Sequence, residues 1–306
     1  MFVDSTLGIV FAVLAALALA VQALCLRMGS REPTPDDAPK ALDALFVVLI
    51  CNLVAFTPFA FWIYFPDFDI TRRSLTALVA AGLCGFFIAR LFHYASINVV
   101  GASRTEPIKA SQPLHATIIA VVLLGETVSA IQLLGIVLIT AGVAAVSWET
   151  TATNRLGLSR KQLVVGLSLP FLAALFYGIE PTLTRIGLLE GTPVLVAGVV
   201  QAGVALGALL AYRGYAGYPV TIDYARSTVS KWYLAAGVAN TTFVFVYFQG
   251  LALAPVSVVV PIVQSSPVLV IILSFVFIQR LERVTGRLIA YGSVVVVGTI
   301  LVSVHI

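Results

Sequence analysis

The sequence predicts an all-α membrane protein whose ten transmembrane helices form two inverted five-helix repeats. Hydrophobic residues make up 60% of the 306 positions and charged residues only 10%, whereas about a quarter of the residues in soluble domains are charged. Apolar stretches recur at the length of about 20 residues that a helix needs to cross a bilayer. The second half of the chain also repeats motifs of the first. We therefore expect a multi-pass protein of the cell membrane.

The apolar stretches fall into two groups of five, separated by a polar linker. Those of the first half cover residues 7–25, 42–65, 75–100, 103–124 and 131–146, and those of the second half cover 163–184, 194–210, 232–254, 256–278 and 288–304. The first stretch has no basic segment before it and no small-residue cleavage site after it, so we expect it to remain as the first span. This organisation predicts a first repeat over 1–148, a linker over 149–161 and a second repeat over 162–306.

A repeated motif indicates that the fourth stretch is a span, although four ionisable residues interrupt it. Pro-Ile-x-x-Ser-x-Pro occurs at 107–113 and again at 261–267, where the surrounding stretch is apolar. Leu-Ala-Ala-Leu followed by Arg and Gly likewise relates 14–29 to 172–187. Because each repeat has an odd number of spans, the second must enter the bilayer from the opposite side. Inverted repeats of this kind allow a central site to face either side in turn.

The end of each repeat carries a similar series of proline, glycine and glutamate residues. In the first copy, Gln112-Pro113 is followed by Leu124-Gly125-Glu126-Thr127, Gly135 and Gly142, and the second copy runs from Gly250 through Pro267 to Glu282 and Gly298. This pattern resembles the EamA-like domain of the drug/metabolite transporter (DMT) superfamily, in two copies that span nearly the whole chain. The resemblance implies a ten-helix secondary carrier of amino acids, nucleobases or other metabolites, with cytoplasmic termini. The second copy departs from the pattern in having Arg280-Leu281-Glu282 in place of Leu-Gly-Glu.

The charges of the loops indicate the opposite orientation. The loops on the side away from the termini carry Arg31, Lys40, Arg155, Arg160, Lys161, Arg226, Lys231, Arg280, Arg283 and Arg287, against mainly Arg72 and Arg73 on the other side. Cytoplasmic loops usually hold the excess of Lys and Arg, which would put the termini outside. The sequence therefore leaves the orientation open.

Several function classes are disfavoured by motifs that the sequence lacks. There is no Gly-Lys dipeptide, and hence no Walker loop for an ATP-driven pump. Cys25, Cys51 and Cys84 stand alone, so neither a metal site nor another cofactor is expected. The net charge of +4 forms no basic stripe, which disfavours nucleic acid as a partner. The alternative is a membrane-embedded enzyme or lipid-binding protein that acts on lipid or isoprenoid substrates. Asp36-Asp37 has no second acidic motif facing it, however, and no catalytic residue is predicted.

Ionisable side chains inside the predicted spans are candidate substrate-binding residues, because each costs at least about 2.5 kcal/mol to insert. Arg90 and His93 lie three residues apart on the third span and could present a cation and an imidazole to an anionic ligand. The alternative is a structural salt bridge with Glu106. Glu106 and Lys109 have the same spacing on the fourth span, where they could neutralise each other or bind a ligand. Both interpretations stay open.

Glu180 is the candidate for proton coupling. It lies in the sixth span next to Pro181 and corresponds, 158 positions along the chain, to Gln22 in the first span. The symmetry predicts that both side chains lie near the central axis. A carboxyl group in apolar surroundings can exchange a proton near neutral pH, which would suit proton-coupled transport. The alternative is an ion pair between Glu180 and Arg185.

Neutral polar residues complete the predicted site. Ser257, Pro261 and Gln264 share one face of the ninth span, where a proline kink could serve as a hinge or merely shape the packing. The remaining candidates lie on spans six and eight and are Tyr177, Asn240, Tyr247 and Gln249.

Together these features predict a secondary active transporter that works by alternating access. It would export or exchange a small polar metabolite, such as an amino acid or another carboxylate-bearing compound. The site is predicted between spans one, three, four, six, eight and nine, with Arg90 and Lys109 attracting a carboxylate or phosphate and Glu180 carrying a proton. The expected partners are the small-molecule substrate, the proton as a candidate coupling ion, and bilayer lipid. Both a monomer and a homodimer fit the sequence.

Overall fold

The computed structural model describes residues 2–31, 40–100, 102–150, 160–217, 228–277 and 285–303, and within these ranges every regular element is helical. Ten helical segments there are long and apolar enough to cross a membrane, which confirms the predicted number of spans. Seven of them are single helices: α1 (Phe2–Arg31), α2 (Lys40–Tyr64), α7 (Ala130–Thr150), α8 (Arg160–Leu189), α9 (Val194–Ala216), α10 (Thr228–Leu253) and α13 (Gly286–Ser303).

The other three spans are built from shorter segments. The third consists of α3 (Arg72–Ala81), the π-helical segment η1 (Gly82–Ala89) and α4 (Arg90–Val100); the fourth consists of α5 (Ala102–Lys109) and α6 (Gln112–Leu124); the ninth consists of α11 (Val256–Val263) and α12 (Ser266–Phe277). The fourth and ninth spans therefore stop and restart at the repeated proline motif, whereas the sequence predicted only a kink there.

The two breaks have the same hydrogen bonds, as the repeat requires. The backbone N–H of Ser111 donates to the carbonyl of Ile108 at 3.1 Å and its hydroxyl donates to the same oxygen at 2.8 Å. Ser265 makes the equivalent bonds to Ile262 at 3.1 and 2.6 Å. Each motif ends in a proline that has no N–H for the carbonyl four residues earlier. The helical hydrogen-bond pattern is therefore interrupted by one tight turn, after which a new helix begins.

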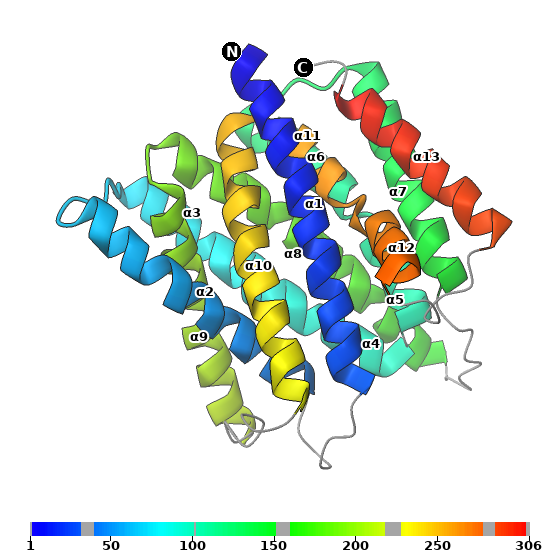
Figure 1. The fold of residues 1–306 in the computed structure, drawn as a ribbon, viewed down its shortest axis with the longest axis horizontal. Coiled ribbons are helices and arrows are strands. Elements are labelled where there is room, and N and C mark those ends of the chain that lie inside the picture. The colour runs from blue at the N-terminus through cyan, green and yellow to red at the C-terminus, as the bar shows by residue number, and fades with distance from the viewer. Residues whose placement is uncertain are drawn as a thin grey trace.

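The helices of the two repeats lie side by side rather than in separate halves. Both chain ends lie at one end of the bundle, where α1 begins and α13 ends; we call it the terminal face, and the other end the opposite face (Figure 1). Across the repeats, α1 packs along α10, α2 along α9 and α7 along α13. The end of α10 contacts the start of α1, and Arg185, near the end of α8, donates a hydrogen bond to the end of α10. The first helix of the second repeat, α8, therefore ends at the terminal face. The repeats are therefore inverted, as predicted.

Small residues allow the closest of these contacts. A Cβ added to Gly135 of α7 would lie 2.7 Å from the carbonyl oxygen of Gly298 of α13, and one added to Gly298 would lie 2.8 Å from that of Gly135. Glycine is thus required at both positions for the two backbones to meet. This is the usual way in which membrane helices pack, since lipid gives little hydrophobic drive for their association.

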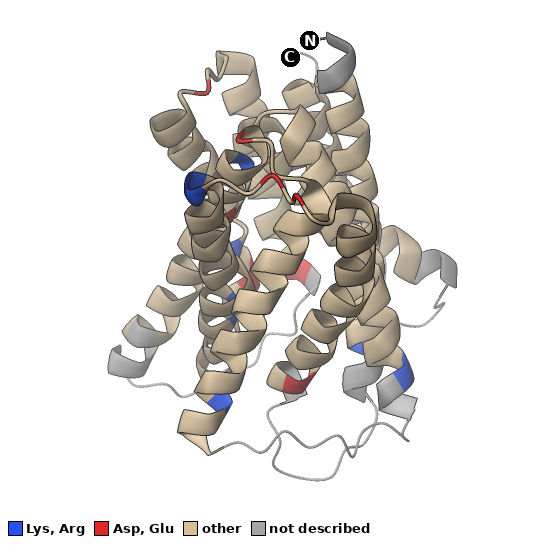
Figure 2. Ribbon diagram, turned by 90° about the vertical axis from the view of Figure 1, so that its left-hand side faces the viewer, with Lys and Arg blue, Asp and Glu red and all other residues tan. Residues whose placement is uncertain are grey.

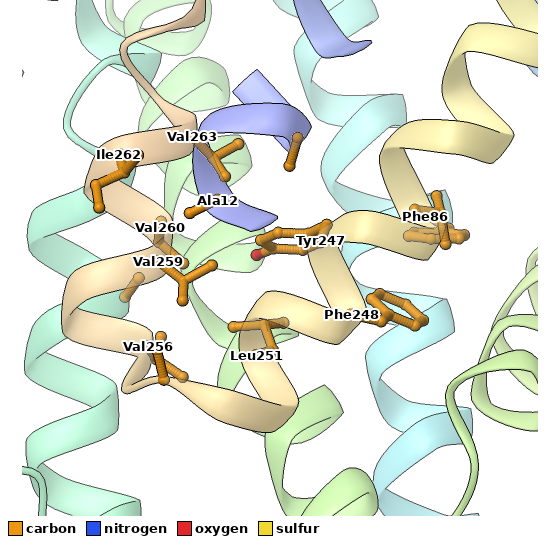
Figure 3. Packing of buried hydrophobic residues seen from close by; sticks show 14 of the residues in the cluster. Ala12, Phe86, Tyr247, Phe248, Leu251, Val256, Val259, Val260, Ile262 and Val263 are labelled. Atoms are coloured by element: carbon orange, nitrogen blue, oxygen red, sulfur yellow. The ribbon is translucent and has the colours of Figure 1, made fainter. Parts of the chain in front are cut away.

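Apolar packing fixes α10 between α11 and the third span. Figure 3 shows part of the buried hydrophobic core, in which Tyr247, Phe248 and Leu251 of α10 lie near Val259 of α11. On the other side, the rings of Phe248 and Phe86 stack with their centroids 6.5 Å apart. This packing holds the Tyr247 side chain, which bears one of the predicted site hydroxyls, in a buried position.

An ion pair that we did not predict fastens α2 to α9 near the opposite face. A guanidinium nitrogen of Arg213 lies 2.6 Å from a carboxylate oxygen of Asp43, and the two side chains are only 2% and 9% exposed. Asp43 was the lone acid in an apolar stretch, which is the signal that could have identified it. Its partner lies 170 residues away.

Candidate functional site

The π-helical segment of the third span makes room for Glu180. A Cβ added to Gly85 would lie 2.3 Å from the Cγ atom of Glu180, so only glycine allows this side chain to lie against the third span. Gly82, one turn earlier, similarly lies against the backbone of Gln201 on α9. Single π-helical turns are rare and are often found at functional sites.

Glu180 is buried and bound by neutral groups. The hydroxyl of Thr184 donates to its carboxylate at 2.8 Å, and the side-chain amide of Gln201 donates to that same hydroxyl at 2.9 Å. The hydroxyl of Tyr247 on α10 also lies beside the carboxylate. The alternative pairing of Glu180 with Arg185 does not occur, because Arg185 instead faces Glu126, 3.7 Å away.

Arg90, at the start of α4, lies beside the aromatic side chains of Phe86 and Tyr177. Its guanidinium carbon is 5.5 Å from the ring centroid of Phe86, within the range of a cation–π interaction. The hydroxyl of Tyr177 lies beside the guanidinium, and Glu180 is near enough to interact with it electrostatically. Among the residues that the structure describes, no carboxylate comes within ion-pair distance of Arg90.

His93, Glu106 and Lys109 form one cluster. The carboxylate of Glu106 lies 2.6 Å from Nε2 of His93 and 2.9 Å from Nζ of Lys109. The structural alternative, a salt bridge to Glu106, is therefore the arrangement found for His93 and for Lys109. The charge of Lys109 is balanced by Glu106, which leaves Arg90 as the less compensated cation of the two.

The two helix breaks meet at the centre of the bundle. The side-chain amide of Gln264, at the break of the ninth span, donates to the side-chain oxygen of Gln112 at 2.6 Å. Gln112 in turn donates to the backbone carbonyl of Tyr177 at 3.4 Å. Sequence reasoning predicted Gln264 but missed Gln112, although Gln112 lies inside the repeated motif. Broken spans that face each other in this way supply polar backbone and side chains near the middle of the membrane.

Two other predicted residues lie in a separate network. The side-chain amide of Asn240 donates to Gln22 at 3.0 Å and its oxygen accepts from Asn52 at 3.1 Å, while Thr241 donates to Asn52 at 2.8 Å. Gln22 therefore binds α10, and its place near a common axis with Glu180 stays a prediction. This network ties α1, α2 and α10 together. Gln249, the last candidate, is half-buried on α10.

The site lies within the membrane-spanning part of the chain. Tyr177 falls at the midpoint of the span from Gly166 to Leu189. Figure 2 shows charged residues at the two ends of the bundle and a small group of them at mid-height. Among the described residues, no group of three His, Cys, Asp or Glu side chains could hold a metal ion. Asp36 and Asp37, which the enzyme alternative would use, lie outside the described residues.

Comparison with known families identifies the fold and the general activity. A model of the EamA-like transporter family matches residues 6–148 and again residues 164–304. The chain belongs to this family. It is therefore a membrane transporter of the DMT superfamily, with one EamA-like domain in each repeat, and the members of its family act as transporters.

The fold of this EamA-like transporter is also found in solved structures. One of them, described only as "Crystal structure of protein", superposes with a TM-score of 0.74 at 16% sequence identity, over 96% of this chain and 95% of that chain. At this identity the likeness establishes the fold alone. A comparison with curated proteins gave no match.

Proposed function

We propose that this transporter is a secondary carrier that exports or exchanges a small carboxylate-bearing metabolite, such as an amino acid, by alternating access. The observation that supports the proposal best is the lack of a countercharge at ion-pair distance from Arg90 among the described residues. This guanidinium lies inside a span, faces Tyr177 and Phe86, and has no carboxylate within ion-pair distance among the described residues. A cation in hydrocarbon needs a counter-charge. A substrate carboxylate would supply it, in the bidentate geometry that guanidinium favours.

The accessible surface of the cluster beside Arg90 supports a route for a polar substrate. The side chains of Glu106 and Lys109 are 29% and 24% exposed although both lie in the fourth span. Exposure of two charges to lipid would be costly, so their accessible surface is best assigned to an aqueous opening. We therefore place the approach of the substrate along α5, on the half of the bundle nearer the opposite face.

Glu180 is proposed to carry the coupled proton. Its carboxylate contacts Thr184 and Tyr247, which are neutral, rather than a basic side chain at ion-pair distance. Such an environment can hold the group either charged or neutral. Arg90 lies close enough to Glu180 to interact with it electrostatically. A change in the charge of Glu180 would therefore alter the affinity of Arg90 for the substrate carboxylate.

The test is uptake of labelled carboxylates by proteoliposomes that contain the purified protein. A panel of amino acids and other small carboxylates is compared with the corresponding amides, and saturable counterflow identifies the substrate. Arg90→Gln is expected to lower uptake of that substrate at least about tenfold, the loss produced by about 1.4 kcal/mol of binding energy. Arg73→Gln is the matched control, since Arg73 carries the same charge at the terminal face and is 74% exposed. Equal uptake by Arg90→Gln and the parent protein would refute the role of Arg90.

A further inference from the structure

Glu126 connects the two repeats at the terminal face. It follows Gly125, which caps the end of α6 in a left-handed conformation (φ 66°). The Glu126 carboxylate accepts the backbone N–H groups of Val256 and Ser257 at 2.8 and 2.9 Å, and the hydroxyl of Ser257 at 2.7 Å. These are the first N–H groups of α11, which have no partner within their own helix. A residue of the first repeat thus caps a helix of the second.

Arg185 completes this connection. Its Nε atom lies 3.7 Å from the Glu126 carboxylate, and one of its terminal guanidinium nitrogens donates to the backbone carbonyl of Leu251 at 2.9 Å. The side chains of Glu126 and Arg185 are only 8% and 15% exposed. Charge-assisted bonds that are shielded from water in this way are stronger than ordinary surface contacts. The group ties α6, α8, α10 and α11 together at one end of the bundle.

The packing next to this group is closed. A Cβ added to Gly8 of α1 would lie 2.4 Å from the Cβ atom of Ala254, the residue between α10 and α11. Thr184, which directly precedes Arg185, and its hydrogen-bond partner Gln201 are fully buried. Glu106 and Lys109, nearer the opposite face, are in contrast 29% and 24% exposed. The polar centre is therefore covered toward the terminal face.

We propose that Glu126, bound to the N-terminus of α11 and to Arg185, is the latch that keeps the terminal face closed in this conformation. The latch must open before the site can be reached from that face. The inference rests on the proposed alternating access, but it concerns the closure of one face and not the identity of the substrate.

The experiment measures how fast a buried reporter thiol reacts. Val259 of α11 is fully buried close to the latch, and Val259→Cys is introduced after Cys25, Cys51 and Cys84 are replaced by Ser. The purified protein is treated with a membrane-impermeant maleimide, without any substrate. Glu126→Gln, which keeps the size but removes the charge, is expected to raise the labelling rate on the order of tenfold or more, because the charge-assisted bonds are roughly twice as strong as neutral ones. Ser257→Ala removes one hydrogen bond and should raise the rate less.

Two controls separate a latch from a general loss of packing. Glu190→Gln removes another carboxylate, one that contacts Arg73 at 3.0 Å on exposed surface, and should leave the rate unchanged. A second reporter, Ile139→Cys, is fully buried on α7 and should stay protected when Glu126 is replaced. An unchanged rate at position 259 in folded Glu126→Gln and Ser257→Ala, or an equal rise at both reporters, would overturn the proposal. Labelling needs no substrate, so this result is independent of whether Arg90 binds a carboxylate.

Discussion

Single glycines decide which side chains can reach the centre of this transporter. Glu180 lies against the third span only because residue 85 has no side chain, and the π-helical turn of η1 presents that backbone to it. Arg90 follows directly on this turn, at the start of α4. The position of Glu180 thus depends on one missing Cβ, and Arg90 lies on the same span just beyond it. Their assignment to substrate and proton binding stays a prediction.

Gly85→Ala is predicted to destabilise the protein by about 1 to 3 kcal/mol, the usual cost of overpacking. The new methyl group would lie 2.3 Å from Glu180, so a helix or the carboxylate must move. The change is seen as a lower melting temperature of the purified protein in detergent. Gly207→Ala on α9 is the matched control. Nothing lies within 4 Å of a Cβ there, and the same substitution should gain about 0.5 to 1 kcal/mol. Equal melting temperatures for the two variants would contradict the packing described here.

Whole helices are joined by a few polar contacts between residues far apart in the sequence. The breaks of the fourth and ninth spans meet through Gln112 and Gln264, and α2 is held to α9 by Asp43 and Arg213. The first contact lies where the helices are interrupted and the second where they are continuous. We therefore expect the α2–α9 pair to move as one unit, with the interrupted spans supplying the flexible joints.

Asp43→Asn is predicted to cost about 3 to 5 kcal/mol, because it breaks a buried ion pair by removing the charge of one partner. The double variant Asp43→Asn with Arg213→Met removes both charges and should recover a large part of the loss. Thermal or denaturant unfolding of the parent, the two single variants and the double variant forms a double-mutant cycle. Purely additive losses would show that the 2.6 Å contact contributes no coupling energy.

The molecule as a whole is ordered by its inverted repeats. The ten spans found among the described residues return the chain to the side from which it started, and α1 begins at the same face at which α13 ends (Figure 1). The family resemblance implies that this face is cytoplasmic, whereas the charges of the loops favour the outside. The two ends of the bundle are equivalent in fold but different in composition.

Tags fused to the two termini are predicted to be equally accessible. In sealed membrane vesicles of one orientation, a protease added outside should remove both tags or neither, and which of these occurs establishes the orientation. A tag in the segment between α8 and α9 serves as a reference for the same face, because Glu190 there contacts Arg73 at the start of α3. Removal of one terminal tag alone would contradict an even number of spans.

The number of spans and their inversion could be predicted from the sequence, and the place where two spans are interrupted could be predicted as a kink. Apolar stretches of membrane length are a local property, and Pro-Ile-x-x-Ser-x-Pro prescribes the same turn wherever it occurs. The contact between Glu106 and Lys109 could also be foreseen from the sequence, since residues three apart on a helix lie on the same face.

Only the tertiary structure decided the partners of the other polar residues. Arg185 lies five positions from Glu180, yet it pairs with Glu126, and Gln22 takes its hydrogen bond from Asn240 of the other repeat. In hydrocarbon each polar group must find a partner, and the one it takes is set by which helices pack together rather than by distance along the chain. The sequence by itself determined two inverted five-helix repeats; the packing of those repeats against each other determined which charges are balanced and leaves Arg90 without a carboxylate at ion-pair distance among the described residues.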